Sequence, residues 1–198
     1  MSAIPAKVSM NTSVPPNRRA SRLKLLLIVF IFAAPIIAAA LLNIRGWQPS
    51  GHGYGEPITP QRNFDQERVQ IRLANGQDWA WRDTSPRMTL IALAGPGCAA
   101  HCLETLTKMA AARITLNNNM DRLRLLYIGQ PPTDAASNGM ENYWSLGSDV
   151  NGSLAAYRPA APDSVSALLV ESDGTALTRY PAGFDPSGLR KDLQKVIR

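Results

Sequence analysis

The chain has 198 residues, a formal net charge of +6 and a pI near 9.7. The first 45 positions contain no Asp or Glu, whereas the remainder holds all 15 acidic residues together with 15 Lys and Arg. The larger part of the chain is therefore neutral, which excludes the basic surface of a nucleic-acid-binding protein and makes the charge a signal of membrane topology.

The N-terminal segment predicts a single membrane anchor. Residues 25–42 read LLLIVFIFAAPIIAAALL, and at about 1.5 Å per residue this run covers most of a hydrocarbon core roughly 30 Å thick. Basic residues precede the run and only Arg45 follows it closely, so the positive-inside rule keeps the N-terminus in the cytoplasm and exports the rest. We expect a disordered cytoplasmic tail at 1–21 and a transmembrane anchor at 22–45.

A cleaved signal peptide is the alternative interpretation of this segment. Pro35 followed by Ala38-Ala39-Ala40 resembles a helix break before a small-residue cleavage site. The apolar run is longer than the usual signal core of about 7 to 15 residues, and the basic leader is long, so a retained anchor is favoured. Both interpretations export the domain that follows.

The exported part begins with a stretch dense in Gly and Pro, 46–60, which is expected to be a tether. Residues 61–198 are enough for one domain with a single core. Apolar and polar residues alternate on both sides of Asn75-Gly76, a pattern that predicts a β-hairpin over 69–81.

Two apolar runs predict buried strands joined by a helix. The strands are MTLIALA at 88–94 and LRLLYI at 123–128. Between them an apolar stripe predicts a helix over 98–116, with Glu104 and Lys108 as an i, i+4 pair outside the stripe. The stripe consists of Leu103, Leu106, Ala110 and Ile114.

The C-terminal part predicts a hairpin and a final helix. Strands at 167–171 and 175–180 flank the turn Asp173-Gly174. Residues 186–198 carry apolar side chains at helical spacing, with Asp185 or the turn before it as the cap. Weaker patterns, each compatible with a short helical turn, occur at 139–146 and 151–162.

The order of these elements predicts the fold class. A parallel pair of strands joined through a helix, followed by an antiparallel hairpin and a helix, is the thioredoxin arrangement. We therefore expect an α/β thioredoxin-like fold, with a central mixed sheet, flanking helices and an N-terminal β-hairpin, after one transmembrane helix.

Two cysteines, Cys98 and Cys102, occur in GPGCAAHC, where the first buried strand turns into its helix. In helical geometry the Cα atoms of residues i and i+4 lie about 6 Å apart, within the range that a disulfide bridges. Cys98 is the expected reactive sulfur, because free N–H groups and the helix dipole stabilise a thiolate at a helix N-terminus. Cys102, one turn deeper, is expected to resolve a mixed disulfide.

Two other uses of the cysteine pair stay open at this point. Two thiolates are soft ligands that suit Cu(I), and an added imidazole completes a three-ligand site. A structural disulfide is also ordinary in an exported domain. A loop closed over three intervening residues removes little chain entropy, however, so a functional pair is favoured over a staple.

Several motifs together resemble one family. The Cys-x3-Cys at the strand-to-helix turn, the anchor, and ALLVESDG followed by a strand and a terminal helix resemble the SCO/SenC group of copper-delivery and thiol-redox proteins used in cytochrome c oxidase assembly. The start at Gly55-Glu56-Pro57-Ile58 and the overall length are similar to small anchored SCO-like proteins of Gram-negative bacteria. The likeness covers about 55–198. It implies a single-pass protein of the bacterial inner membrane with a cytoplasmic N-terminus and a periplasmic domain.

The resemblance implies a Cu(I) site with Cys98 and Cys102 as its two thiolates. The family's third ligand is a histidine shortly before the strand that ends in Asp-Gly, where alignment places Asp163 or a neighbour, and no histidine follows His101. The proline after the first family cysteine is replaced by Ala99. His101 offers a substitute third ligand at helical spacing, and its alternative role is a solvent-facing residue that tunes the thiolate when protonated.

These features lead to a functional expectation with alternatives. We expect a membrane-anchored thioredoxin-like protein that supports oxidase assembly, by thiol chemistry or a chaperone role in preference to copper insertion. Its expected partners are an oxidase subunit or another periplasmic thiol protein, and not nucleic acid. The alternatives are a general periplasmic thiol-disulfide oxidoreductase and a non-catalytic binding module with a structural disulfide.

Overall fold

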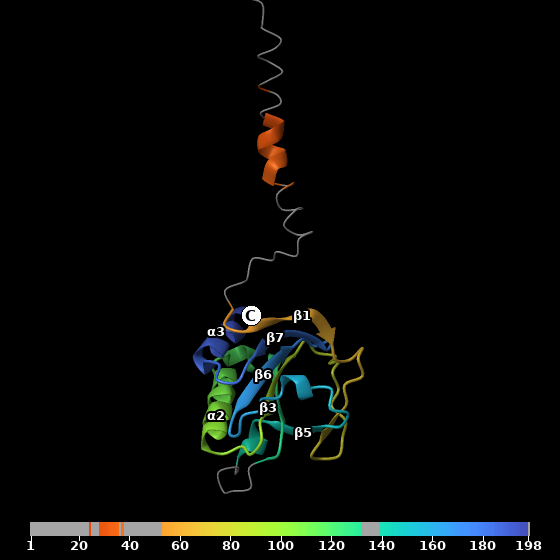
Figure 1. The fold of residues 1–198 in the computed structure, drawn as a ribbon, viewed down its shortest axis with the longest axis vertical. Coiled ribbons are helices and arrows are strands. Elements are labelled where there is room, and N and C mark those ends of the chain that lie inside the picture. Colours follow the sequence, from red (N-terminus) through yellow and green to blue (C-terminus); the bar gives the residue numbers. More distant parts are fainter. Residues whose placement is uncertain (1–23, 25–27, 36, 38–52, 132–138, 198) are drawn as a thin grey trace, which may run out of the picture. The chain divides into compact units, whose positions relative to one another are not determined.

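Most of the residues that the structure describes belong to the C-terminal of two units. The chain divides into two units, residues 1–51 and 52–198. The computed structural model (Figure 1) describes residues 24, 28–35, 37, 53–131 and 139–197.

The predicted cytoplasmic tail, 1–21, lies outside the described residues, and so does most of the predicted anchor, 22–45. Of the anchor, residues 24, 28–35 and 37 are described and helical. Within the described ranges no helix combines the length and the apolar character needed to cross a membrane.

One mixed β-sheet forms the centre of the domain (Figure 1). In the described part of the chain the strand order is β1-β7-β6-β3-β4-β5-β2. Strands β3, β4 and β5 are parallel to one another, and the other pairs are antiparallel. The strands are β1 (Glu56–Asn63), β2 (Ile71–Leu73), β3 (Met88–Ala94), β4 (Leu123–Ile128), β5 (Ser145–Asp149), β6 (Val165–Val170) and β7 (Thr175–Tyr180).

Two α-helices, α2 (Ala100–Ile114) and α3 (Pro186–Val196), belong to the described domain and pack beside each other on one face of the sheet (Figure 1). Helix α2 makes the crossover from β3 to its parallel neighbour β4. Short 3₁₀ turns complete the elements: η1 (Asn117–Arg122), η3 (Met140–Asn142) and η4 (Ala155–Tyr157).

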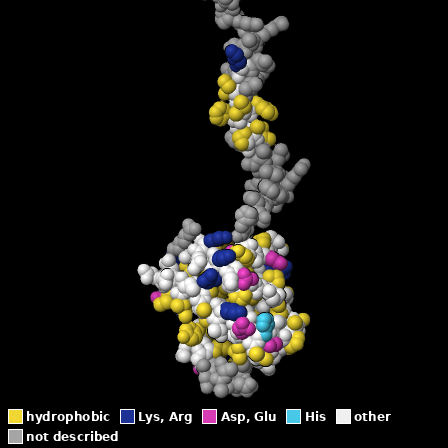
Figure 2. All heavy atoms as spheres, turned by 90° about the vertical axis from the view of Figure 1, so that its left-hand side faces the viewer, with side chains coloured by type: hydrophobic (Ala, Val, Ile, Leu, Met, Phe, Trp, Pro, Cys, Tyr) yellow, Lys and Arg dark blue, Asp and Glu magenta, His cyan; other side chains and the backbone are white. Residues whose placement is uncertain are grey.

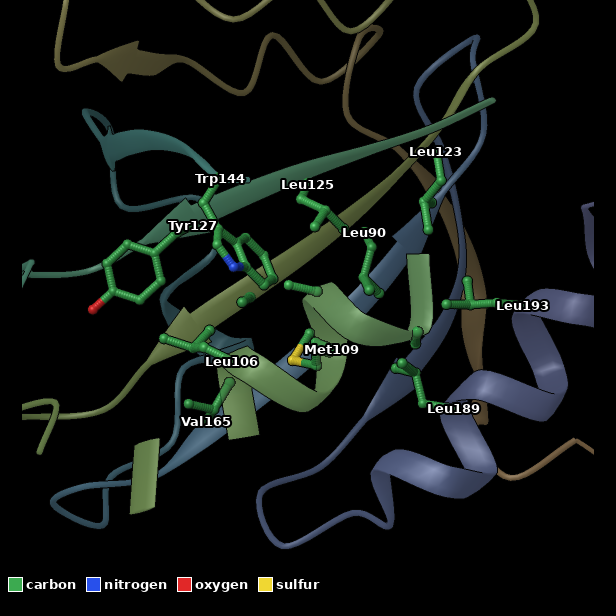
Figure 3. Packing of buried hydrophobic residues seen from close by; sticks show 14 of the residues in the cluster. Leu90, Leu106, Met109, Leu123, Leu125, Tyr127, Trp144, Val165, Leu189 and Leu193 are labelled. Atoms are coloured by element: carbon green, nitrogen blue, oxygen red, sulfur yellow. The ribbon is translucent and has the colours of Figure 1, made fainter. Parts of the chain in front are cut away.

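Each face of the sheet buries its own apolar core, because successive side chains of a strand point to opposite faces. On the helical face, Leu90 and Leu125 pack with Met109 of α2 and Leu189 of α3 (Figure 3). On the other face, Ile91, Leu126 and Leu168 of the central strands pack against the segments that precede β3 and β6. The three central strands, β3, β4 and β6, are buried on both faces, and each therefore consists mostly of apolar residues.

The apolar runs and the terminal helix form as predicted. Strands β3, β4 and β7 cover the predicted residues, and β6 overlaps its predicted range. Asp185 caps α3, its carboxylate accepting hydrogen bonds from the N–H groups of Ser187 and Gly188. The parallel β3–α2–β4 unit, followed by the β6–β7 hairpin and α3, confirms the thioredoxin-like mixed sheet.

The N-terminal hairpin predicted over 69–81 forms over a shorter range, because the N–H of Leu73 donates to the carbonyl of Gln77 and the N–H of Trp79 donates to that of Ile71. Its second arm forms a single bridge, from Asp78 to Arg72, and β2 also pairs with β5. The side chain of Trp81 turns into the core, where its indole N–H donates to the carbonyl of Val69 at 2.6 Å. Burial of a large aromatic side chain stabilises more than an extended two-stranded ladder would, so the chain leaves the sheet.

Two strands lie where none is predicted. Strand β1 begins at Glu56, inside the predicted tether 46–60, and its register against β7 shifts between Pro57 and Arg62. Proline has no N–H to donate, and it is tolerated in this strand because β1 is at the edge of the sheet. Strand β5 carries the polar sequence SLGSD, which has no strand pattern.

The buried face of α2 differs in part from the predicted stripe. Leu106 and Ala110 are buried as expected, but Ile114 is 55% exposed beside an open apolar groove near Trp144. The predicted pair outside the stripe forms, with Lys108 Nζ 2.7 Å from a Glu104 carboxylate oxygen. The buried residues of α2 are Cys102, Leu106, Met109, Ala110 and Ala112.

Because Tyr127 is buried, we expect the free energy of unfolding to fall at alkaline pH. Burial raises the pKa of this tyrosine to about 12, above the value of about 10 in an unfolded chain. Its contribution is therefore complete below pH 10 and is lost as the pH rises toward 12, because the unfolded chain ionises first. We expect urea unfolding to show this decline, and a smaller one in Tyr127→Phe. Identical declines in the two proteins would contradict the assignment, since Tyr180, whose pKa burial also raises, is present in both.

Candidate functional site

The two cysteines lie at the junction of β3 and α2. β3 ends at Ala94, the chain turns through Gly95-Pro96-Gly97, and α2 begins at Ala100. Cys98 and Cys102 form a disulfide with their Cα atoms 5.2 Å apart. The bridging geometry predicted from the i, i+4 spacing is therefore present.

The two sulfur-bearing residues differ in exposure. Cys102 is fully buried in the core on the helical face of the sheet, among residues such as Leu106 and Met109. Cys98 is half-buried and packs against the edge of the same core. A partner that approaches from solvent therefore reaches Cys98 first, and Cys102 is shielded behind it.

The turn that carries Cys98 is held by the loop before β6. Gly97 adopts a left-handed conformation with a φ of 63°, which glycine accepts without strain. Gly95 passes so close to the carbonyl of Ala161 that a Cβ would clash with it, and its N–H donates to the carbonyl of Ser164 at 2.9 Å. The position of the disulfide thus depends on a segment more than sixty residues later in the chain.

Asp163 supplies the N-terminal cap of α2 from that loop. The residue at the cap position, Ala99, has no side chain that can accept a hydrogen bond. One carboxylate oxygen of Asp163 accepts from the N–H groups of Ala99 and Cys102, at 2.8 and 2.9 Å. The other accepts from the N–H of His101 at 3.1 Å. The N–H group of Cys102, followed by those of His101 and Ala99, holds the pKa of the Asp163 carboxyl below its usual value.

Asp163 also binds the turn through its own backbone. Its N–H group donates to the carbonyls of Pro96 and Gly97, at 3.2 and 3.0 Å. Its φ of 50° is a left-handed conformation that few residues other than glycine adopt, although Asp and Asn are enriched there. Asp163 therefore contacts the cysteine segment on both sides of Cys98.

His101, the predicted substitute ligand, is exposed to solvent. Figure 2 shows a surface histidine with side chains of both charges beside it. Its positive form, when present, lowers the pKa values of Glu104 and Asp163, although hydrogen bonds are the larger cause for both carboxylates. His101 is thus placed to act on the charge of the first turn of α2.

In the oxidised form that the structure shows, the cysteine pair is not a copper site of the kind that the SCO resemblance implies. Both sulfurs are joined in the disulfide, so neither is a thiolate. Asp163, aligned with the family histidine, gives both oxygens to backbone N–H groups. Within residues 53–131 and 139–197, no group of three or more His, Cys, Asp or Glu side chains is arranged to hold a metal ion. A site built from the reduced cysteines with His101 stays a prediction.

The mixed sheet, the crossover helix and the disulfide at its first turn define a thioredoxin-like protein. Residues 88–198 match the family model described as the transmembrane-like, thioredoxin-like, C-terminal domain. The chain belongs to this family. The matched range includes the whole site, from β3 through the disulfide to α3.

Solved structures of similar fold include Sco proteins and a peroxiredoxin. Copper-bound ScoI of Arabidopsis thaliana has 15% identity and a TM-score of 0.48, covering 72% of this chain and 97% of that one. Peroxiredoxin Q of Xanthomonas campestris has 13% identity and a TM-score of 0.48, with the same 72% and 97% coverage. Apo Sco1 of Thermus thermophilus has 14% identity and a TM-score of 0.46, covering 76% of this chain and 96% of that one. The comparison with curated proteins gives no match. The prediction of a thioredoxin-fold chain is confirmed by the family model and by the observed sheet. The SCO likeness of the sequence stays a resemblance.

The capping role of Asp163 is the feature of the site that the sequence did not reveal. Alignment placed this residue at the position of a family ligand, but nothing local connects it to α2. A signal does exist, since the helix begins with Ala99-Ala100 and lacks a Ser, Thr, Asp or Asn at its start. Such a missing cap indicates that another part of the chain satisfies the first N–H groups.

Proposed function

We propose that this protein carries out thiol–disulfide exchange on the periplasmic side of the inner membrane, with Cys98 as the attacking sulfur and Cys102 as the resolving one. The unequal exposure of the two cysteines carries this proposal. A half-buried cysteine at the surface, joined to a fully buried one, suits a protein that forms a mixed disulfide and then resolves it internally.

The reaction consists of two reversible exchanges at sulfur, so the same steps can reduce a partner or, in reverse, oxidise it. In the reduced protein the Cys98 thiolate attacks one sulfur of a partner disulfide, and the second partner sulfur leaves as a thiolate and takes up a proton. Cys102 then loses its proton and attacks the Cys98 sulfur, which releases the partner's first sulfur as a thiolate. Two electrons pass to the partner, and the Cys98–Cys102 disulfide forms.

We infer that this thiol–disulfide exchange serves the assembly of a respiratory oxidase. The sequence resemblance to SCO/SenC proteins supports a role in cytochrome c oxidase assembly. The predicted anchor supports it too, because a short tether would keep Cys98 near integral subunits of the membrane. On this proposal the direct partner is an oxidase subunit or another periplasmic thiol protein.

The reduction potential of the disulfide tests the proposed exchange. The full-length protein, purified in mild detergent, is equilibrated with glutathione or dithiothreitol redox buffers and its free thiols are counted. We expect a potential between about −270 and −120 mV, the range of thiol-exchange proteins. A potential below about −300 mV, typical of structural disulfides, would contradict the proposal and favour a binding module.

A copper titration separates thiol chemistry from copper handling. The reduced full-length protein is titrated with Cu(I) against a competing chelator. We expect weak binding, because Asp163 is engaged by three backbone N–H groups and is not a soft ligand. Tight one-to-one binding that is lost in both Cys98→Ser and His101→Ala would overturn this expectation and establish the substitute copper site.

A further inference from the structure

We propose that Asp163 sets the redox balance of the Cys98–Cys102 pair and makes the reduced protein an electron donor. This inference rests on the proposed exchange function and adds its direction. Three observations support it: the backbone N–H groups that donate hydrogen bonds to the Asp163 carboxylate, the negative charge of that carboxylate, and the left-handed backbone conformation of Asp163.

The first step concerns the N–H groups of the first helical turn. At a helix N-terminus these free donors and the helix dipole normally stabilise a cysteine thiolate. In this protein the N–H groups of Ala99, His101 and Cys102 all donate to Asp163 instead. A thiolate at Cys98 therefore loses the donors that would lower its energy.

The second step concerns charge. The same carboxylate oxygen binds the N–H groups of Ala99, which follows Cys98, and of Cys102, so a negative charge lies within the turn that both cysteines span. A thiolate is repelled by this charge, whereas a disulfide, which is neutral, is not. Asp163 thus destabilises the reduced, ionised form of the pair relative to the oxidised form.

The third step concerns the cost of placing Asp163 there. Its φ of 50° lies in a region that is sparsely populated by residues other than glycine, and such positions cluster at functional sites. Its backbone N–H is also committed, to the carbonyls of Pro96 and Gly97. The chain therefore holds the carboxylate against the cysteine segment by two independent sets of contacts.

The consequence is a direction for electron flow. Exchange proteins whose reduced form is stabilised are strong oxidants, and those whose reduced form is not are reductants. With Asp163 in place, the dithiol passes two electrons to a disulfide of a client protein and becomes the Cys98–Cys102 disulfide. An external dithiol must then reduce that disulfide and be oxidised itself. The client is thus a protein that must be kept with free thiols outside the cytoplasm.

The experiment compares full-length wild-type protein with Asp163→Asn. Asparagine keeps an acceptor oxygen and tolerates the left-handed backbone, but it has no charge. We expect the equilibrium constant against dithiothreitol to shift about tenfold toward the dithiol, roughly 30 mV for a two-electron couple. We also expect iodoacetamide to alkylate the reduced variant at Cys98 several times faster than the reduced wild type.

Asp185→Asn is the matched control. Asp185 caps α3 with the same kind of hydrogen bonds, to the N–H groups of Ser187 and Gly188, so this variant also weakens a helix cap. We expect its potential to equal that of the wild type. An equal rise in both variants would overturn the inference, because a general loss of helix capping would then explain it.

Further outcomes separate this inference from the proposed function. Asp163→Asn with an unchanged or lower potential, in a protein that exchanges normally, overturns the inference alone. A wild-type disulfide that dithiothreitol does not reduce in the folded protein overturns the exchange function and this inference with it. If Asp163→Asn does not fold, Asp163→Ser, which keeps a capping hydroxyl without charge, must show the same rise for the inference to stand.

Discussion

Replacement of Cys98 by serine is expected to abolish thiol–disulfide exchange, whereas replacement of Cys102 leaves a protein that captures its partner and does not release it. The reason is the order in which a partner meets the two sulfurs. Cys98 is half-buried at the turn, and Cys102 is buried in the core behind it. Without Cys102, nothing inside the protein attacks the mixed disulfide formed at Cys98.

The measurement uses a model disulfide substrate and non-reducing gel electrophoresis of the full-length protein. Cys102→Ala is the suitable variant, because a serine hydroxyl would be buried at this position without an assured partner. We expect a mixed disulfide with Cys102→Ala and none with Cys98→Ser or with the double variant. Equal trapping by the two single variants would show that the exposure of the cysteines does not determine their roles.

Replacement of Leu90 by alanine is expected to lower the free energy of unfolding by about 2 to 5 kcal/mol, as large-to-small changes in cores do. Leu90 lies in the central strand β3, has 0% exposure, and packs on the face covered by α2 and α3 (Figure 3). The strand on which it lies leads directly to Cys98. Equilibrium urea unfolding of the oxidised protein measures the change.

Ile114→Ala is the control for this stability prediction. Ile114 is also an apolar residue of the domain, but it is 55% exposed at the end of α2. Alanine is the better helix former, so the expected change is within about 0.5 kcal/mol. A loss at Leu90 no larger than that at Ile114 would contradict the burial of β3 on the face covered by α2 and α3.

The central part of the fold was predictable because its signals are local and strong. The apolar runs of β3 and β4 are each broken by one polar residue, Thr89 and Arg124, and such runs in a domain of this size predict strands that are buried on both faces. The cap of α3 by Asp185 could also be foreseen, since the cap and the N–H groups it binds are neighbours in sequence.

The edges of the sheet were not predictable in the same way. Strand β1 contains Pro57, which belongs equally well to a linker, and strand β5 has no alternation of apolar and polar residues. The second arm of the expected hairpin ends at Trp79, earlier than predicted, because Trp81 is buried in the core. At these positions contacts with distant residues outweigh local preference.

Local patterns in the sequence were enough to place the two cysteines at the turn from a buried strand into a helix and to predict that a disulfide can join them. Spacing and hydrophobic periodicity are local properties, and they were sufficient for both conclusions. Only the tertiary structure decided what surrounds the pair. The carboxylate of Asp163 reaches the first turn of α2 from 61 to 64 residues away, a contact that exists only because the sheet places the loop before β6 beside the end of β3.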